Sequence, residues 1–554
     1  MPIRKLHQVC LLTLIVSLMT VVASAQSFQI QCPTTTITHP VERTSLQGEP
    51  AYSGPTTFTT GADGYQVPNA NVNGAIKCQQ ISGGDGFATM GDGTQTYLFA
   101  FGPLSGLADM AAGKPGTQFP DVFNTPYSGT FQPGDPATTN HAGDAPYSIG
   151  SLFGTPGGFS FNGAVGLAPD TDCLANPACA AKIPANGIDG HVDTRAIMDV
   201  AIMNGNMPAP LMAIDEDDEF FLTLTNVGQV MRPDLFEQHT VHFHGYPNAS
   251  AFYDGVPDAS VAINIGGSFT YYYLAPDAGT YFWHCHITPP EHLQMGMVGQ
   301  IYVRPRQNRW LGDLYSGLLQ QQGDERTACR RKNDGGSPGV NGPTDILCSN
   351  PVPAVNTHAS GGGKYAYNDG DGSTRYDVEY PLQIHGFDPN FHFVGMTFNP
   401  EGFTDMKDKY FLLNGRSYPD TVNPDPLATQ TTDGVMHYSQ PLPSIINIPV
   451  GGRALLRIAD LDVTEYQTLA SLGIRMHVIG YNAKLLRDQA GNNLDYYTNS
   501  ITLAGGESLD VILDASDTNK YPSGSVFYLY TPNLDHLSND AENFGGLMTE
   551  VRIN

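Results

Sequence analysis

The sequence predicts an all-β protein built from two β-sandwich domains with long loop insertions. Two stretches, Asp218–Val303 and Tyr410–Ile553, hold short runs of aromatic and β-branched residues separated by glycine, proline and aspartate. Short strands at this spacing are typical of β-sandwiches. The chain has 61 glycines and 41 prolines to form the turns, and no glycine-rich strand-to-helix fingerprint of a dinucleotide-binding fold is evident.

The predicted strands fall into two blocks. Those of the first block are Glu219–Leu224, Val261–Ile265, Phe269–Leu274, Thr280–His286 and Gln300–Val303. Those of the second block are Ile445–Ile448, Ala454–Ile458, Met476–Ile479, Leu509–Leu513, Val526–Tyr530 and Met548–Ile553. Residues 104–195 and 330–375 are rich in Gly, Pro, Asp, Asn and Thr with little periodicity, so we expect surface loops or insertions there.

Residues 1–25 have the features of a secretory signal peptide. Arg4 and Lys5 form a charged start, an apolar stretch follows, and Ala23–Ala25 matches a small-residue cleavage site. No later segment is long and apolar enough to predict a membrane span. We therefore expect an exported protein, secreted or periplasmic. Its net charge of −27 argues against a nucleic-acid partner, because phosphate binding needs basic patches.

Export permits disulfide bonds, and the chain has eight cysteines, of which Cys10 would leave with the signal peptide. Connectivity cannot be proved from a sequence, but proximity favours three local pairs. The leftover Cys285 then needs another role. The three expected pairs are Cys32 with Cys78, Cys173 with Cys179, and Cys329 with Cys348.

The neighbours of Cys285 indicate a metal centre. Six of the 16 histidines lie between His239 and His292, in the stretches HTVHFHG and WHCH and at His292 itself. Side chains alternate between the faces of a strand, so His284 and His286 point one way and Cys285 the other. His242 and His244 likewise share a face. The pattern predicts two metal environments back to back, which we call the imidazole site and the thiolate site.

The thiolate site needs two histidines and a weak thioether ligand beside Cys285, which is the composition of a blue-copper centre. His239 and His292 are free to serve as the histidines. Met297, five residues after His292, suits the axial position. Met295 is the alternative, and otherwise belongs to the core.

These motifs resemble those of the multicopper oxidases and of their two-domain relatives, the copper nitrite reductases. The stretch His239–Gly245 is similar to the first copper motif of the family. The stretch His284–His286, followed by His292 and Met297, is similar to the last. Residues 409–421 and 543–551 are more weakly similar to the copper-poor cupredoxin domain of these proteins.

The resemblance implies two cupredoxin-like Greek-key β-sandwich domains and a role for each motif residue. After the signal peptide, residues 26–200 would be an N-terminal extension with insertions, 201–310 the copper-binding core, 311–375 a linker or insertion, and 376–554 the copper-poor domain. Asp254 is similar to an acid that orients a ligand or relays protons, or is an ordinary turn aspartate. Type 1 copper would be held by His239, Cys285, His292 and Met297, and type 2/type 3 copper by His242, His244, His284 and His286.

The sequence also departs from the family pattern. A complete trinuclear cluster uses four His-x-His pairs, and this chain has two. His477 stands where the nitrite reductase relatives place a catalytic histidine, and either it or His536 would approach the cluster across a subunit interface, unless both are structural. We therefore expect a homotrimer, because two-domain relatives complete their sites between subunits.

The implied function is copper-dependent oxidoreduction. A small-molecule, metal-ion or redox-protein donor would give electrons to the type 1 copper, and dioxygen would be reduced at the imidazole site. Nitrite reduction is one alternative, and a pure electron carrier or copper-binding protein is another. A nitrite reductase would be expected to have Asp in place of His242, which favours the oxidase.

Overall fold

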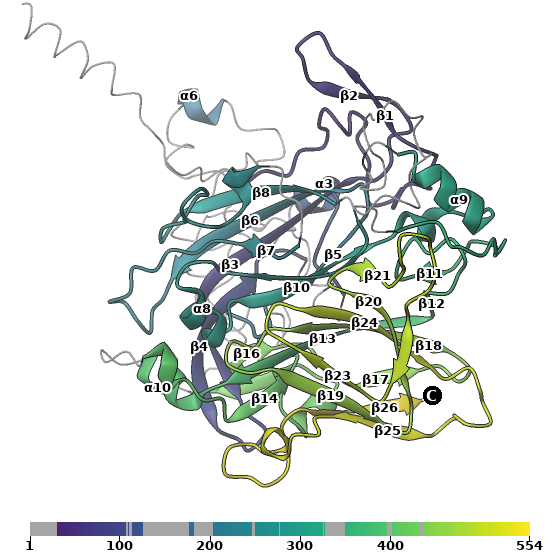
Figure 1. Cartoon of the computed structure of the whole chain (residues 1–554). Coiled ribbons are helices and arrows are strands. Elements are labelled where there is room, and N and C mark those ends of the chain that lie inside the picture. The colour runs from purple at the N-terminus through teal and green to yellow at the C-terminus, as the bar shows by residue number, and fades with distance from the viewer. Residues whose placement is uncertain are drawn as a thin grey trace, which may run out of the picture.

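The computed structural model describes residues 30–106, 114–125, 177–181, 203–245, 250–275, 277–324, 350–395, 402–431 and 436–554, with Asp109, Arg326 and Gly434. Strands dominate these residues and form two β-sandwiches, the first above the second in Figure 1. The predicted all-β fold with two sandwich domains is confirmed. None of the described helices has the length and apolar character needed to span a bilayer.

The first sandwich packs two four-stranded sheets around an aromatic core that includes Phe220, Tyr271 and Trp283. Within the sheets β6 runs parallel to β3, and β10 runs parallel to β5. One sheet has the order β4 (Gln95–Pro103), β3 (Ile76–Thr89), β6 (Glu219–Gly228) and β8 (Ser268–Leu274). The other has the order β5 (Met212–Asp215), β10 (Val298–Arg304), β9 (Gly279–His284) and β7 (His242–Phe243).

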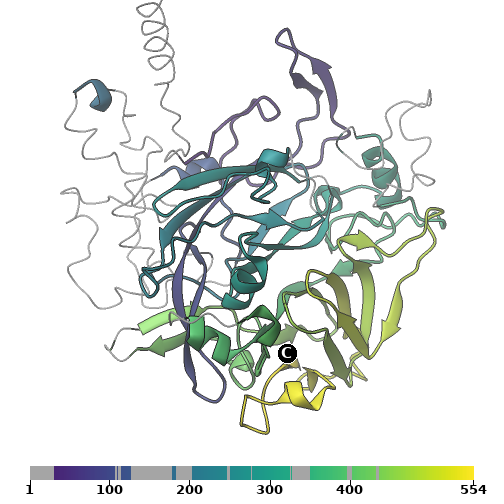
Figure 2. The same ribbon diagram turned by 60° about the vertical axis from the view of Figure 1, so that its left-hand side comes forward.

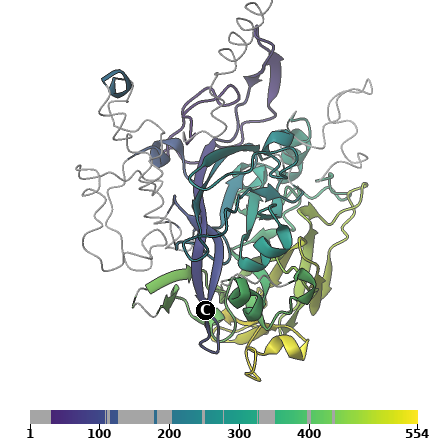
Figure 3. The same cartoon turned by 90° about the vertical axis from the view of Figure 1, so that its left-hand side faces the viewer.

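Four of the five strands predicted for this block are present. The expectation of a strand at Val261–Ile265 is wrong, because Ile263 forms only an isolated bridge with His239. Strands β3 and β4, by contrast, come from the segment 26–200 and supply half of the first sheet. Their hairpin extends to the second sandwich, as Figure 3 shows, where Thr89 Oγ1 lies 2.7 Å from Thr429 Oγ1.

The second sandwich has a larger mixed sheet and a five-stranded sheet around an aliphatic core that includes Leu456, Val511 and Val551. All six strands predicted for this block are present. The larger sheet has the order β14 (Tyr410–Leu413), β13 (Val378–Phe387), β18 (Arg453–Asp460), β24 (Ser508–Asp514), β20 (Met476–Tyr481) and β21 (Lys484–Leu485), with β22 (Tyr496–Thr498) also on β20. The other has the order β17 (Ile446–Ile448), β26 (Met548–Ile553), β25 (Val526–Tyr530), β19 (Gln467–Leu472) and β23 (Ser500–Leu503).

Short elements complete the described chain. Three two-stranded ribbons pair β1 (Thr57–Thr60) with β2 (Gln66–Ala70), β11 (Lys364–Tyr365) with β12 (Arg375–Tyr376), and β15 (Leu427–Gln430) with β16 (Met436–Gln440). The α-helices are α3 (Pro120–Phe123), α6 (Pro177–Ala180), α8 (Pro289–Met295), α9 (Leu314–Gln321) and α10 (Pro389–Gly395). Helix α8 lies on the side of the first sandwich that faces the second, as Figures 1 and 2 show.

Buried charges tie the two sandwiches together. Glu379, on β13, accepts from Arg304 of the first sandwich at 2.9 Å and from Arg457 of the second at 3.0 Å. Burial alone would raise the pKa of Glu379, but the two guanidinium groups lower it to about 2. Thr280, on β9, donates to Asp510, on β24, at 2.6 Å. These contacts give the first sandwich a fixed place on the second.

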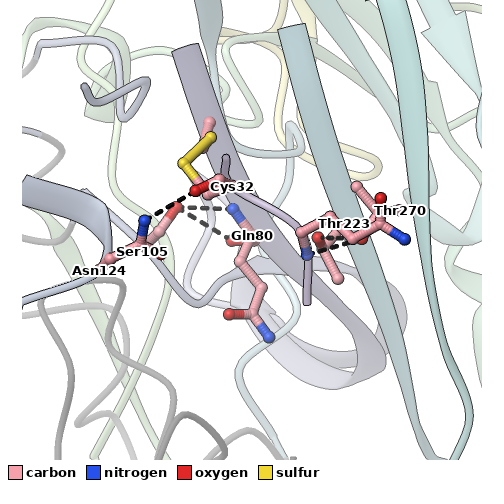
Figure 4. The surroundings of a disulfide bond; sticks show 8 residues. Cys32, Gln80, Ser105, Asn124, Thr223 and Thr270 are labelled. Atoms are coloured by element: carbon pink, nitrogen blue, oxygen red, sulfur yellow. Dashed lines mark hydrogen bonds between the residues drawn. A yellow bond between two sulfur atoms is a disulfide. The ribbon is translucent and has the colours of Figure 1, made fainter. Parts of the chain in front are cut away.

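One disulfide lies in the described residues, between Cys32 and Cys78 of β3, as predicted. Figure 4 shows its surroundings, where the Asn124 side chain donates to the Cys32 carbonyl at 2.7 Å. The predicted pairs Cys173–Cys179 and Cys329–Cys348 involve residues outside the described chain and stay predictions. Cys285 is a free, buried cysteine.

Candidate metal centre

The thiolate site forms where β9 ends and α8 returns to it. His239, Cys285 and His292 are fully buried and offer one donor atom each, all within 4.8 Å of one another. His292 Nδ1 lies 3.3 Å from Cys285 Sγ. Neither ring nitrogen of His239 has a hydrogen-bond partner among the described residues. Because an unpaired buried polar group is costly, a metal ion between these donors would satisfy them.

The surroundings of Cys285 favour the thiolate. Burial alone would raise the pKa of the thiol, but the His292 and His239 imidazoles hold it well below its ordinary value. The backbone N–H of Thr240 also points to Sγ, at 3.4 Å. Conversely, burial would lower the pKa of His292, but Cys285 and Glu237 raise it to about 9. The deprotonated sulfur is the form that binds soft metals.

Met297 lies beside the thiolate site, between the end of α8 and the start of β10. It is fully buried, and its carbonyl accepts from Cys285 N at 3.1 Å. A Cβ atom on Gly83 of β3 would lie 3.3 Å from Met297 Cε and 2.6 Å from His239 Cδ2, so both side chains pack against this glycine. Met295 is also buried in the same core and stays the alternative axial ligand.

The imidazole site lies on the other face of the β9 end. His242 of β7 pairs directly with His284 of β9, and the donor atoms of His242, His244 and His284 lie within 4.8 Å of one another. His244 Nε2 is 2.9 Å from His284 Nε2. His286 lies beside this group, with its ring centroid 5.0 Å from that of His242.

Hydrogen bonds to backbone carbonyls determine which nitrogen of two of these rings is left to bind a metal. His242 Nδ1 donates to the Asp254 carbonyl at 2.7 Å, and His284 Nδ1 donates to the Cys285 carbonyl at 2.6 Å. In each neutral ring the Nε2 lone pair is then left for a metal, as is usual for histidine ligands. Burial, with the neighbouring imidazoles, lowers the pKa of His284 to about 3 and that of His244 to about 4. Both rings are therefore neutral and able to coordinate at pH 7.

The three more distant predicted residues differ in their placement. Asp254 is brought to the imidazole site, with Oδ2 3.5 Å from His242 Nδ1. His477 pairs with Asp495 at 3.1 Å and stacks on Tyr497. His536 lies between Gln467 and Glu465, at 2.9 and 3.0 Å. In the part of the chain that the structure describes, neither second-sandwich histidine joins the imidazole group.

A pocket of about 390 Å³ opens beside the imidazole site, between the two sandwiches. His244 and His284 line one side, and the second sandwich lines the other with residues that include Asp462, Glu465 and Tyr466. No sequence motif marks these residues, because only the packing of the two sandwiches brings them to the histidines. None marks Glu237 either, whose Oε2 is brought within 3.6 Å of His292 Nε2 by packing inside the first sandwich.

Comparison with known proteins agrees with this geometry. Residues 189–308 match the family model described as multicopper oxidase. Laccase abr2 of Aspergillus fumigatus is 33% identical over 113 residues, 20% of this chain and 18% of that protein. A copper-containing nitrite reductase of Rhizobium meliloti is 35% identical over 109 residues, 19% of this chain and 26% of that protein. Residues 189–308 are therefore similar in sequence to the multicopper oxidase family.

The chain spans only about a fifth to a quarter of the length of these curated relatives. Among solved structures, a blue copper oxidase from Nitrosomonas europaea is 21% identical and aligns with a TM-score of 0.41, over 63% of this chain and 78% of that chain. The two β-sandwiches are defined by the strand order and register of this chain's own described residues.

Proposed function

We propose that this protein is a copper-dependent oxidoreductase of the multicopper oxidase type, which passes electrons from a reducing substrate to dioxygen. The observation that carries the proposal is that the two donor groups, thiolate and imidazole, meet back to back at His284 and Cys285. Two histidines, a thiolate and a thioether suit a blue-copper centre, and converging imidazoles suit further copper ions.

The residues that would hold copper are those of the two sites. Bound copper would supply one-electron redox chemistry at the thiolate site and the reduction of dioxygen at the imidazole site. The protein itself supplies the connection, because His284 and Cys285 are adjacent and are also joined by the His284 Nδ1 hydrogen bond to the Cys285 carbonyl. The proposed ligands are His239, Cys285, His292 and Met297 at the thiolate site and His242, His244, His284 and His286 at the imidazole site.

Carboxylates flank both sites and would handle protons. Glu237 lies beside His292 Nε2, on the side away from Cys285, and its side chain is 25% exposed. It is placed to accept a proton where a small-molecule donor releases one on oxidation, whereas a metal ion or a redox protein would give up an electron alone. Asp254, 30% exposed, holds His242 through its carbonyl and would deliver protons to the imidazole site as dioxygen is reduced.

Assembly and location belong to the same proposal. With two His-x-His pairs instead of four, a complete cluster would need ligands from another subunit, and we propose a homotrimer in which His477 or His536 of a neighbour supplies them. The signal-peptide pattern expected at residues 1–25 and the Cys32–Cys78 disulfide support a secreted or periplasmic protein, because disulfides persist in oxidising compartments.

Nitrite reduction is the second candidate, since a copper-containing nitrite reductase is among the relatives. Histidine at position 242, where a nitrite reductase would have Asp, favours dioxygen. Supplying a reduced donor to copper-loaded protein, with dioxygen or nitrite offered separately, separates the two by which acceptor is consumed.

The thiolate assignment is tested with Cys285→Ser. Copper-loaded wild-type protein should be intensely blue, and the variant should lose the colour while keeping its circular dichroism spectrum. A variant that stays blue would show that another residue binds the type 1 copper.

A further inference from the structure

The second sandwich holds the helix that carries His292. Helix α8 runs from Pro289 to Met295, and Gly296 and Met297 follow it. His385 Nε2, from β13, lies 2.9 Å from the Leu293 carbonyl. His292 and Met297, two residues of the thiolate site, are therefore separated by a segment whose backbone is hydrogen-bonded to the second sandwich.

Two further contacts hold the next residue, Gln294. His392 Nε2, from α10, lies 2.9 Å from the Gln294 carbonyl, and Asp408 accepts from the Gln294 side chain at 2.8 Å. His392 also reaches β4, with Nδ1 2.7 Å from the Tyr97 carbonyl. All of these groups are buried. Consecutive residues of α8 thus meet three side chains of the second sandwich, none of which belongs to the thiolate group.

The position of these contacts on the helix is informative. The last carbonyls of an α-helix have no partner within the helix and are satisfied by following N–H groups, side chains, water or ligands. The Leu293 carbonyl accepts from the Gly296 N–H at 3.0 Å, and the second sandwich adds side-chain contacts to this carbonyl and to the next one. Here the side-chain partners come from 90 or more residues away in the sequence, as the separations of 92 and 98 residues show. A helix of seven residues is too short to be stable alone, so its position depends on such tertiary contacts.

We propose that His385, His392 and Asp408 are positioning residues for the thiolate site, which fix α8 so that His292 and Met297 stay against Cys285. The proposal rests on the proposed copper function of that site. The ligand geometry and surroundings of a blue-copper centre set its redox potential. Through these three side chains the copper-poor sandwich would set the potential at which the other sandwich accepts electrons.

The test compares donor-removing and donor-keeping variants at both histidines. His385→Leu removes the N–H that faces the Leu293 carbonyl. Burial lowers the pKa of His392 to about 3, so its ring has one N–H between the Gln294 and Tyr97 carbonyls, and His392→Leu removes that N–H. His385→Gln and His392→Gln keep a donor at nearly the same place. Leu382→Ala, on the same strand as His385, is the matched control, because it weakens the second core and leaves both histidines. Asp408→Ala removes the third contact and serves if a histidine variant does not fold.

Two readouts are needed. In metal-free protein, amide hydrogen exchange of residues 291–297, which follow the two prolines of α8, should be about five- to tenfold faster in the leucine variants, as expected for one lost hydrogen bond. In copper-loaded protein, the charge-transfer band and the reduction potential should shift. The glutamine variants should restore both readouts, and Asp408→Ala should change them in the same direction as the leucine variants.

The outcomes are separable from those of the proposed function. Leucine variants that match wild type, glutamine variants that fail to rescue, or a Leu382→Ala control that shifts both readouts equally would overturn the positioning role. The exchange measurement needs no copper, so it stands even if wild-type protein fails to form a blue centre. Failure to form a blue centre would refute the proposed function, whereas the exchange measurement would still show whether the contacts to α8 fix the helix.

Discussion

At the scale of single residues, the state of Cys285 is set by its neighbours. The His292 and His239 imidazoles outweigh the burial that would keep the thiol protonated, and its pKa falls well below the ordinary value. Cys78 lies fully buried in the same sandwich but is bonded to Cys32. The two cysteines therefore have separate roles, one in a structural bond and one as a candidate ligand.

A thiol count tests this division. Metal-free protein, unfolded without reductant and treated with an alkylating agent, should carry a single label, at Cys285, by mass spectrometry. After reduction, Cys32 and Cys78 should be labelled as well. Recovery of Cys285 in a disulfide would contradict the assignment.

The candidate ligands could be predicted from the sequence because their residue types are concentrated and their spacing follows strand alternation. His284 and Cys285 are adjacent, so they must face opposite sides of β9. Glu237 and Asp462 could not be predicted, because a single carboxylate carries no pattern and reaches a histidine only through tertiary packing. His385 and His392 could not be predicted either, because in the sequence they are isolated histidines of the second domain.

At the scale of secondary-structure elements, β3 shows where hydrophobic alternation fails to predict a strand. Its 14 residues, IKCQQISGGDGFAT, are almost all buried, so they lack the alternation that marks a half-exposed strand. Two of its glycines stand at close approaches, since a Cβ on Gly83 would lie 2.6 Å from His239 and one on Gly86 2.4 Å from the Gly205 carbonyl. Glycines that interrupt a strand pattern mark such approaches.

Gly83→Ala should therefore disturb the thiolate site. The added methyl group would push His239 from its place, and we expect copper affinity at that site to fall by roughly ten- to hundredfold, as for other changes beside metal ligands. Copper titration followed by absorbance measures the effect. Gly402→Ala is the control, because its methyl group would meet only the flexible Asp405 side chain, at 3.1 Å. Equal affinities in the two variants would show that β3 does not shape the site.

At the scale of the whole molecule, the pocket and the ligand helix both lie where the sandwiches meet, so their relative placement matters. Glu379 ties them, and its pKa of about 2 lies below the ordinary carboxyl value because Arg457 and Arg304 favour the charged form. A depressed carboxyl pKa adds stability that is fully present above about pH 4.5. That stability is lost as the pH falls through 2.

Glu379→Gln should remove this contribution. At pH 7 we expect the free energy of unfolding to fall by about 3 kcal/mol, because the buried Arg457 guanidinium and the partly exposed Arg304 guanidinium lose their partner. The difference from wild type should shrink below pH 4.5, and urea unfolding at several pH values measures it. Arg375→Gln breaks an exposed pair with Asp377 and should have a much smaller effect. A pH-independent difference would contradict the ion-pair explanation.

The imidazole site makes a prediction about assembly. His477 and His536 are partnered within their own sandwich, and in the proposed homotrimer the surface that carries them would meet the imidazole site of another copy. Light scattering should give a trimer whose copper content exceeds one ion per chain. A monomer with a full cluster that reduces dioxygen would refute this, since the extra ligands would then come from within the chain.

The most direct test of the central claim is the absorption spectrum of the purified wild-type protein loaded with Cu(II). Cys285, held as a thiolate between His239 and His292, should give an intense blue charge-transfer band at one copper ion per chain. A colourless protein that binds copper with the sandwiches folded would contradict the claim that this chain carries a type 1 copper site.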